Sequence, residues 1–423
     1  METYLPIKET FVRIARRVPG VVYAPAEEVQ TLRTAVLVMH SDEDYLTCPT
    51  GAELSRRGCV VLCANVMNKE GVFFSQAEKM HAVKAAVAYL RSRKDVGKIC
   101  LMGHSGGATL MTAYQAIAEN GPEVFMGEEK ILPYTDTEPM LPADGLLLFD
   151  PNWGNAIMQL FSLDPAVTDE TTGKGLDPRY DLFEPANGFD PNGSRFSEDF
   201  IRRFQQKQGE RNQAILTHAL ERYAAIQEGK GLYADDEPLV IPGADQGFLN
   251  NKLYAQDTRL MAHTEGEYPL LHGDGTETVE VIRSLRGPEN PVSLTDRFCG
   301  GARMMTVMNY LSSYAVRTDS EYGYDESSVY GIDWSSTYNS PVGNVEHIHV
   351  PTLIVGMTAG WEYLASETIY RHCAAQDKHI AFVEGATHKF YPDRAREAYP
   401  GQFGDTIKTL HDYAARWLAD REG

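Results

Sequence analysis

The pattern Gly-x-Ser-x-Gly at residues 103–107 constrains the fold of this chain more than any other feature. A short apolar run, 99–102, precedes it, and an apolar stretch with helix-compatible spacing, 108–114, follows it. This context suits a sharp strand-to-helix turn that holds a serine hydroxyl clear of a sheet, with glycines where side chains find no room. We therefore predict that Ser105 is a nucleophile; the alternative is a serine in an ordinary loop.

Short apolar runs that alternate with amphipathic stretches predict an α/β fold with a parallel sheet. Strands are expected at 33–40, 59–66, 99–102, 146–149, 351–356 and 380–383, and helices at 51–58 and 77–93. Connections between parallel strands are right-handed, so the sheet should be doubly wound.

The strand–helix rhythm breaks after about Asp150 and returns near Val345. The intervening segment is rich in turn residues, contains one long helical pattern at 197–228, and gathers aromatic residues towards its end. At 423 residues the chain is long for one core. We expect residues 1–150 and 346–423 to form a catalytic core, and residues 151–345 to form a mainly helical cap over the active site.

A serine needs a base within hydrogen-bond reach, and that base needs a third group to orient it. His388 is the predicted base because it lies on the loop after the last predicted strand, at the sheet edge where Ser105 emerges. Two residues are candidates for the acid that orients His388. Asp150, which ends the fourth predicted strand, is preferred, and Glu362, which follows the fifth, is the alternative. Glu367 is an outside candidate. The competing interpretations are an Asp-Pro turn at Asp150 and a solvated loop carboxylate at Glu362.

An oxyanion hole needs two backbone N–H groups directed at the developing charge. The amides of Gly106, which follows the nucleophile, and Ser41, which follows the first predicted strand, are the candidates. Substrate contacts are expected from His40, His104, Trp153 and Trp361. No metal site is expected, because the pair His347 and His349 has no third ligand at a suitable spacing.

Taken together, these motifs resemble the α/β-hydrolase superfamily. His40-Ser41 is similar to its oxyanion turn, residues 103–107 to its nucleophile turn, and the runs 351–356 and 384–388 to its closing strand and histidine loop. The resemblance covers about half of the chain. Two departures stand out: Ser41 replaces the usual glycine, and the usual aspartate before His388 is missing.

The resemblance implies a cofactor-free hydrolase that works through an acyl-serine intermediate. We expect a carboxylic-ester hydrolase of the esterase or lactonase type, acting on a fairly bulky apolar ester or lactone; a macrocyclic lactone would suit the size of the cap. The same triad also supports hydrolysis of C–C or amide and peptide bonds. A catalytically silent binding scaffold is the alternative from another class.

The composition of the chain limits the classes of molecule that it is expected to bind. A net charge of −20 and a pI near 5.0 argue against nucleic acid and anionic membranes as partners, so a small-molecule substrate is expected. No export signal and no long apolar run are visible, which predicts a cytoplasmic location without disulfides among the six cysteines. A homo-oligomer is compatible with the sequence, although no feature predicts one.

Overall fold

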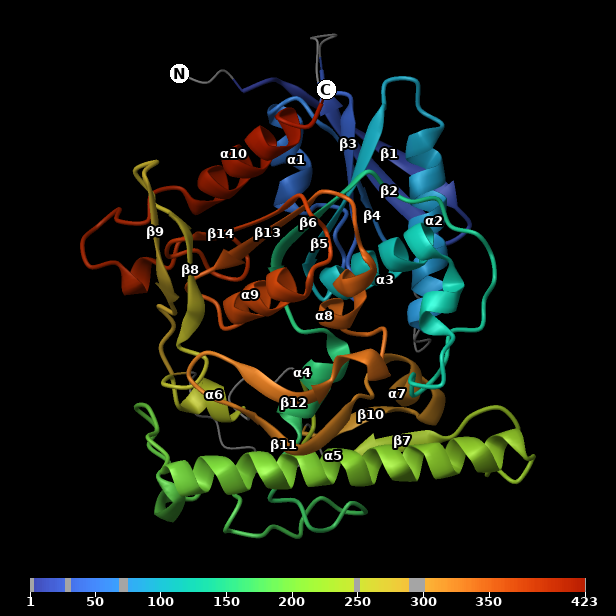
Figure 1. Cartoon of the computed structure of the whole chain (residues 1–423), viewed down its shortest axis with the longest axis vertical. Helices are drawn as coiled ribbons and strands as arrows, with labels where there is room; N and C mark the ends of the chain where they lie inside the picture. Colours follow the sequence, from blue (N-terminus) through green and yellow to red (C-terminus); the bar gives the residue numbers. More distant parts are fainter. Residues whose placement is uncertain (1–3, 27–31, 68–74, 247–251, 289–300, 423) are drawn as a thin grey trace.

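The computed structural model describes residues 4–26, 32–67, 75–246, 252–288 and 301–422. Within these residues, a ten-stranded sheet forms the centre of the molecule, in the order β1-β2-β4-β3-β5-β6-β13-β14-β8-β9 (Figure 1). Its strands are β1 (Ile7–Ala15), β2 (Val18–Pro25), β3 (Thr34–Val38), β4 (Val60–Ala64), β5 (Lys98–Ser105), β6 (Gly145–Pro151), β8 (His263–Leu271), β9 (Glu277–Arg283), β13 (Thr352–Met357) and β14 (Lys378–Val383). Neighbours from β4 to β8 pair in parallel, whereas β1, β2 and β9 pair antiparallel. The expected mostly parallel sheet is confirmed.

Helices cover both faces of the sheet because the middle positions of its central strands are apolar and buried on both faces. Leu37 on one face shares a hydrophobic cluster with residues of α2 (Gln76–Arg91), α3 (Gly107–Asn120) and α9 (Tyr363–His372). Val36 on the other face shares a second cluster with residues of α1 (Pro49–Arg56) and α10 (Thr406–Ala419). Alternation along each strand thus sends successive side chains into opposite layers, which gives the doubly wound arrangement.

The segment 151–345, expected to form a cap, contributes to two parts of the molecule. Strands β8 and β9 lie within it and extend the central sheet beyond β14. Its remaining elements lie beyond the sheet: α4 (Asn155–Ser162), α5 (Glu198–Gln227), β7 (Pro238–Ile241), α6 (Leu253–Gln256), β10 (Arg303–Thr306), α7 (Val307–Ser313), β11 (Arg317–Tyr324) and β12 (Val329–Asp333). The long helical pattern is confirmed as α5, which begins after Ser197, whose hydroxyl accepts the Phe200 N–H, and which crosses the end of the molecule opposite the termini (Figure 1). The chain returns to the core through the short helix α8 (Pro341–Asn344).

Five ring side chains connect the elements beyond the sheet to the edge where the candidate site lies. This aromatic cluster consists of Trp153, Phe161, Tyr254, Tyr324 and Trp361, with neighbouring ring centroids 5.4 to 5.7 Å apart. Its members come from α4, α6, β11 and the loops after β6 and β13. Such packing fixes the insertion against the end of β6 and the loop after β13, which carry the candidate acids.

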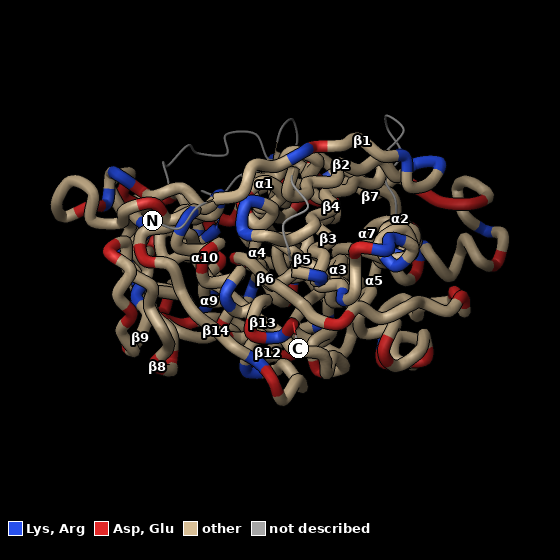
Figure 2. Tube along the Cα trace, turned by 90° about the horizontal axis from the view of Figure 1, so that it is seen from above, with Lys and Arg blue, Asp and Glu red and all other residues tan. Residues whose placement is uncertain are grey.

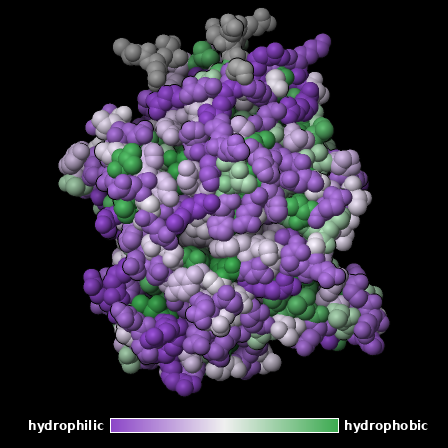
Figure 3. Space-filling view, in the orientation of Figure 1, coloured by the Kyte–Doolittle hydropathy of each residue, from purple (hydrophilic) through white to green (hydrophobic). Residues whose placement is uncertain are grey.

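Acidic and basic residues are interspersed along the described chain (Figure 2), with 59 Asp and Glu against 39 Lys and Arg in the sequence. The face shown in Figure 3 is mostly hydrophilic, and its apolar patches are separate from one another. None of the described helices combines the length and the apolar run needed to cross a membrane. The five described cysteines are buried and free; Cys299 lies outside the described residues.

Candidate active site

The nucleophile candidate lies at the turn between β5 and α3. Ser105 ends the strand with a φ of 53°, a left-handed conformation that is uncommon for residues other than glycine. A Cβ on Gly103 would lie 2.6 Å from the Ala108 Cα, and a Cβ on Gly107 would lie 2.7 Å from the Met39 carbonyl oxygen. Both glycines are therefore required by close backbone approaches, as the sequence pattern predicts.

Asp150 ends the adjacent strand β6 and is fully buried. Its φ of 41° is also left-handed. One carboxylate oxygen accepts the Met357 N–H at 2.9 Å, and the other lies 2.7 Å from Nδ1 of His388. The backbone bond holds the carboxylate in place, so the Asp150–His388 pair has the arrangement of a triad acid and base.

Glu362, the alternative acid, contacts the same imidazole nitrogen. It lies in the loop after β13, at the start of α9, with 4% of its surface exposed, and its Oε2 forms an ion pair with His388 Nδ1. Glu367 instead accepts the backbone N–H groups of Glu265 and Gly266 at 3.0 and 2.9 Å. The structure thus brings both principal acid candidates to one nitrogen and places the outside candidate elsewhere.

The two carboxylates dominate the electrostatics of the base. Burial alone lowers the pKa of His388, but the negative charges of Glu362 and Asp150 outweigh it and raise the pKa to about 10. Burial raises the pKa of Glu362, an effect that nearby Asp150 reinforces and His388 opposes. The cluster therefore holds a proton more tightly than a single Asp–His pair would.

Asn152 connects the nucleophile to this cluster, and the sequence analysis did not single it out. Its Nδ2 lies 3.4 Å from Ser105 Oγ, and its side chain also hydrogen-bonds Glu362. The signal was its position two residues after Asp150, on the same turn. Because Nδ1 of His388 is occupied by the carboxylates, Nε2 is the nitrogen that remains for the serine hydroxyl.

The predicted oxyanion turn lies against the start of α3. A Cβ on Gly106 would lie 2.9 Å from Ser41 Oγ and 3.5 Å from His40 Nε2, so these three residues adjoin. The backbone N–H groups of Asp42 and Glu43 donate to His40 Nδ1 at 3.0 and 2.9 Å, which places the proton of the neutral ring on Nε2. Burial lowers the pKa of His40 to about 4, so the ring is a neutral N–H donor.

One acidic residue beside the oxyanion turn is compensated by a buried cation. Asp42 accepts the Ser41 hydroxyl at 2.6 Å and pairs with Lys79 Nζ at 2.6 Å. Burial raises the pKa of Asp42, but Lys79 more than offsets it and lowers the value to about 2. The pair adds no net charge, so Asp42 need not oppose a developing oxyanion.

His104 takes a different position from the expected substrate contact. Its Nε2 lies 2.7 Å from the carbonyl oxygen of His388, and its Nδ1 hydrogen-bonds the Tyr45 hydroxyl. Its ring also packs against that of His388 in a tilted arrangement, with centroids 4.5 Å apart. Both ring nitrogens have protein partners and leave none for a substrate, because the residue joins β5 to the loop of the base. Tyr45 is a second residue that sequence reasoning missed.

The two predicted tryptophans belong to the aromatic cluster. Trp153 is fully buried against Phe161, whereas Trp361 is half-buried against Tyr254 and directly precedes Glu362. Part of the Trp361 surface is exposed, whereas the surface of Trp153 is already covered.

The group Asp150, Glu362 and His388 is also the described set whose ligand atoms lie close enough to hold a metal ion, all within 4.8 Å of one another. Two ligands about 2.1 Å from one tetrahedral ion lie roughly 3.4 Å apart. The 2.7 Å separation of Asp150 Oδ2 and His388 Nδ1 is shorter and matches a charge-assisted hydrogen bond. The contacts fit a hydrogen-bonded cluster rather than a metal shell.

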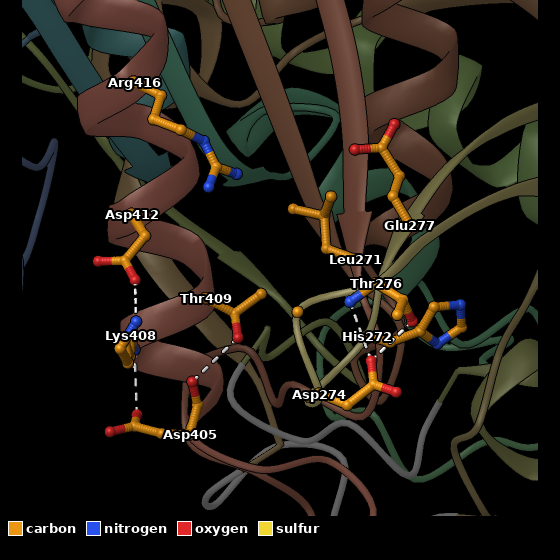
Figure 4. A pocket seen from close by; sticks show the side chains of 12 residues that line it. Leu271, His272, Asp274, Thr276, Glu277, Asp405, Lys408, Thr409, Asp412 and Arg416 are labelled. Carbon is orange, nitrogen blue, oxygen red and sulfur yellow. Dashed lines mark hydrogen bonds and ion pairs between the residues drawn. The ribbon is translucent and has the colours of Figure 1, made fainter. Parts of the chain in front are cut away.

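A cavity of about 330 Å³ lies between the β8–β9 turn and α10 (Figure 4). Three of its carboxylates have partners within the protein: Asp412 pairs with Lys408, Asp274 accepts from Thr276, and Asp405 caps α10. None of its lining residues is a candidate triad member. These contacts lie within α10 or within the turn, and they give this cavity no link to the candidate active site.

The strand order, with Ser105 ending β5, Asp150 ending β6 and His388 following β14, defines an α/β-hydrolase fold, as the sequence motifs predicted. No protein-family model and no curated protein matches the chain. Among solved structures, a hypothetical protein from Pseudomonas aeruginosa is 12% identical, with a TM-score of 0.45 over 99% of this chain and 95% of its own. Est1E from Butyrivibrio proteoclasticus is 10% identical, with a TM-score of 0.39 over 97% and 98%. The siderophore hydrolase EstB from Aspergillus fumigatus is 12% identical, with a TM-score of 0.43 over 98% of both chains.

Proposed function

We propose that this chain is a serine hydrolase that cleaves a carboxylic ester through an acyl-serine intermediate. The observation that carries the proposal is Ser105 at a left-handed strand-to-helix turn, joined through Asn152 to the cluster in which the buried Asp150 holds Nδ1 of His388. A hydroxyl in this setting is activated by general-base catalysis rather than by a cofactor.

In the proposed reaction, His388 Nε2 takes the Ser105 proton while Oγ attacks the ester carbonyl carbon. The oxyanion receives hydrogen bonds from the amides of Gly106 and Ser41, and the imidazolium is stabilised by Asp150. The tetrahedral intermediate then expels the alcohol, which leaves with the proton from Nε2. Water then enters and gives a proton to the same nitrogen while its oxygen attacks the acyl carbon. The bond from that carbon to Ser105 Oγ breaks, Oγ takes the proton back from Nε2, and the acid leaves.

The proposed substrate is a fairly bulky apolar ester or lactone, with a macrocyclic lactone as the finer hypothesis. Support comes from Trp361, which adjoins Glu362 and packs with Tyr254 of α6, so that an apolar surface lies beside the proposed base.

Hydrolysis of p-nitrophenyl esters of increasing acyl length, and of a lactone panel, tests the proposal. Ser105→Ala and His388→Ala should each lower turnover by about 10⁴-fold or more while the protein stays folded. A folded wild type without activity on esters and lactones, or a Ser105→Ala variant of wild-type activity, contradicts the hydrolase proposal. Fast turnover of acetyl esters with none of bulky esters contradicts the substrate class alone.

A further inference from the structure

The proposed base has two buried acidic partners where a Ser-His-Asp arrangement needs one. Asp150 and Glu362 approach His388 Nδ1 from different strand ends, β6 and β13. The described part of the chain places no other carboxylate on this nitrogen. Two negative charges beside one Nδ1–H favour the protonated form of the imidazole more than one charge does.

We propose that Glu362 is a positioning residue that shares the His388 Nδ1 proton with Asp150, so that the enzyme gains its active base only at raised pH. This inference rests on the proposed function, because it concerns the protonation of the proposed base. The two carboxylates have different supports: Asp150 is held by the Met357 N–H at 2.9 Å, whereas Glu362 is reached by the Asn152 side chain. Asp150 is thus the fixed orienting acid, and Glu362 mainly adds negative charge.

The remaining groups around His388 do not cancel that charge. His104, whose ring packs against it from β5, is kept neutral because burial lowers its pKa well below the ordinary value. From the loop after β3, burial keeps His40 neutral by lowering its pKa, and burial raises the pKa of the Tyr45 hydroxyl. Lys389, on the loop of the base itself, is the nearby cation and acts on His104.

The sign of the effect follows from these contacts. Negative charge beside an imidazole favours its protonated form, and a protonated base cannot accept the serine proton. Removing the charge of Glu362 should therefore lower the pH at which the base becomes competent. An opposite charge at this distance shifts a pKa by about one to three units.

Glu362→Gln tests the inference, since it keeps the size of the side chain and removes its charge. The readout is the second-order rate constant for fluorophosphonate labelling of Ser105 between pH 5 and pH 10, which needs no knowledge of the substrate. The acid limb should move down by about one to three pH units. Glu367→Gln is the matched control, because it alters a buried carboxylate of α9 that binds backbone amides instead; its profile should match the wild type.

A Glu362→Gln profile with the wild-type midpoint, or one moved to higher pH, overturns the inference. If this variant does not fold, selective ¹⁵N-histidine NMR of the wild type, with His388→Asn for assignment, supplies the measurement. A His388 midpoint above about 8 supports the second carboxylate, and a midpoint near the ordinary 6.5 overturns it. Absence of labelling at every pH is a failure of the proposed hydrolase, which leaves the NMR titration as a separate test.

Discussion

Gly107→Ala tests whether the close contact between α3 and the end of β3 positions the oxyanion turn. The new Cβ would lie 2.7 Å from the Met39 carbonyl oxygen, a backbone atom that cannot rotate away. The contact must open by roughly 0.7 Å to reach an ordinary separation. The strand end continues directly into Ser41, so its amide moves with it.

The rate effect can be bounded from the loss of one oxyanion donor, which costs about 2.7–4 kcal/mol, or about 10²–10³-fold in turnover. A shift of this size is expected to remove most of the stabilisation that the Ser41 amide gives the oxyanion. Overpacking should also lower the folding stability by about 1–3 kcal/mol. Turnover of the best ester and the free energy of unfolding in urea are the two measurements.

The control is Gly209→Ala in α5, where the added Cβ would lie 3.0 Å from the Tyr322 ring. This change should affect stability but leave turnover within about twofold of the wild type. Gly107→Ala with wild-type turnover would refute the argument, because the turn would then not depend on this approach. Equal rate losses in both variants would mean that general destabilisation is the cause.

Three further outcomes are expected. Asp150→Asn should lower turnover by about 10²-fold, rather than the 10⁴-fold or so expected for a sole triad acid, because Glu362 still contacts Nδ1. Steady-state kinetics of this variant, of Glu362→Gln and of the double variant check this prediction, and additive losses would contradict it. Tyr45→Phe removes the hydroxyl that donates to buried His104, so the free energy of unfolding should fall by about 1–3 kcal/mol. We also expect kcat to fall by about tenfold with KM unchanged, because His104 holds the loop of the base. An unaltered kcat would show that Tyr45 and His104 do not position His388. Exhaustive EDTA treatment should leave ester hydrolysis unchanged, and loss of activity that zinc restores would reverse our interpretation of the buried cluster.

The central strands could be predicted from the sequence because strands buried on both faces read as continuous apolar runs. All six predicted strands are present, and the two predicted helices are α1 and α2. The N-terminal strand β1 was missed because its Lys-Glu-Thr residues face solvent at the sheet edge. Strand β8 was missed because it mixes charged, glycine and proline residues, and only contact with β14 places it in the sheet.

For the site, sequence order predicted Ser105 and His388 because each follows a strand at the same sheet edge. The sequence did not decide which residue is the triad acid, because a carboxylate follows each of two strands. Which of the two side chains reaches His388 depends on the positions of the strands in the sheet, and these cannot be derived from the sequence. The contacts of His104 could not be predicted either, since its partners lie 59 and 284 residues away in the chain.

The most direct test of the account is the mass of the intact protein after treatment with a fluorophosphonate, followed by peptide mapping. We expect one adduct, on Ser105, that is absent from Ser105→Ala and strongly reduced in His388→Ala. A folded wild type that gains no adduct, or gains one on another serine, would contradict the proposal that the turn after β5 carries an activated nucleophile.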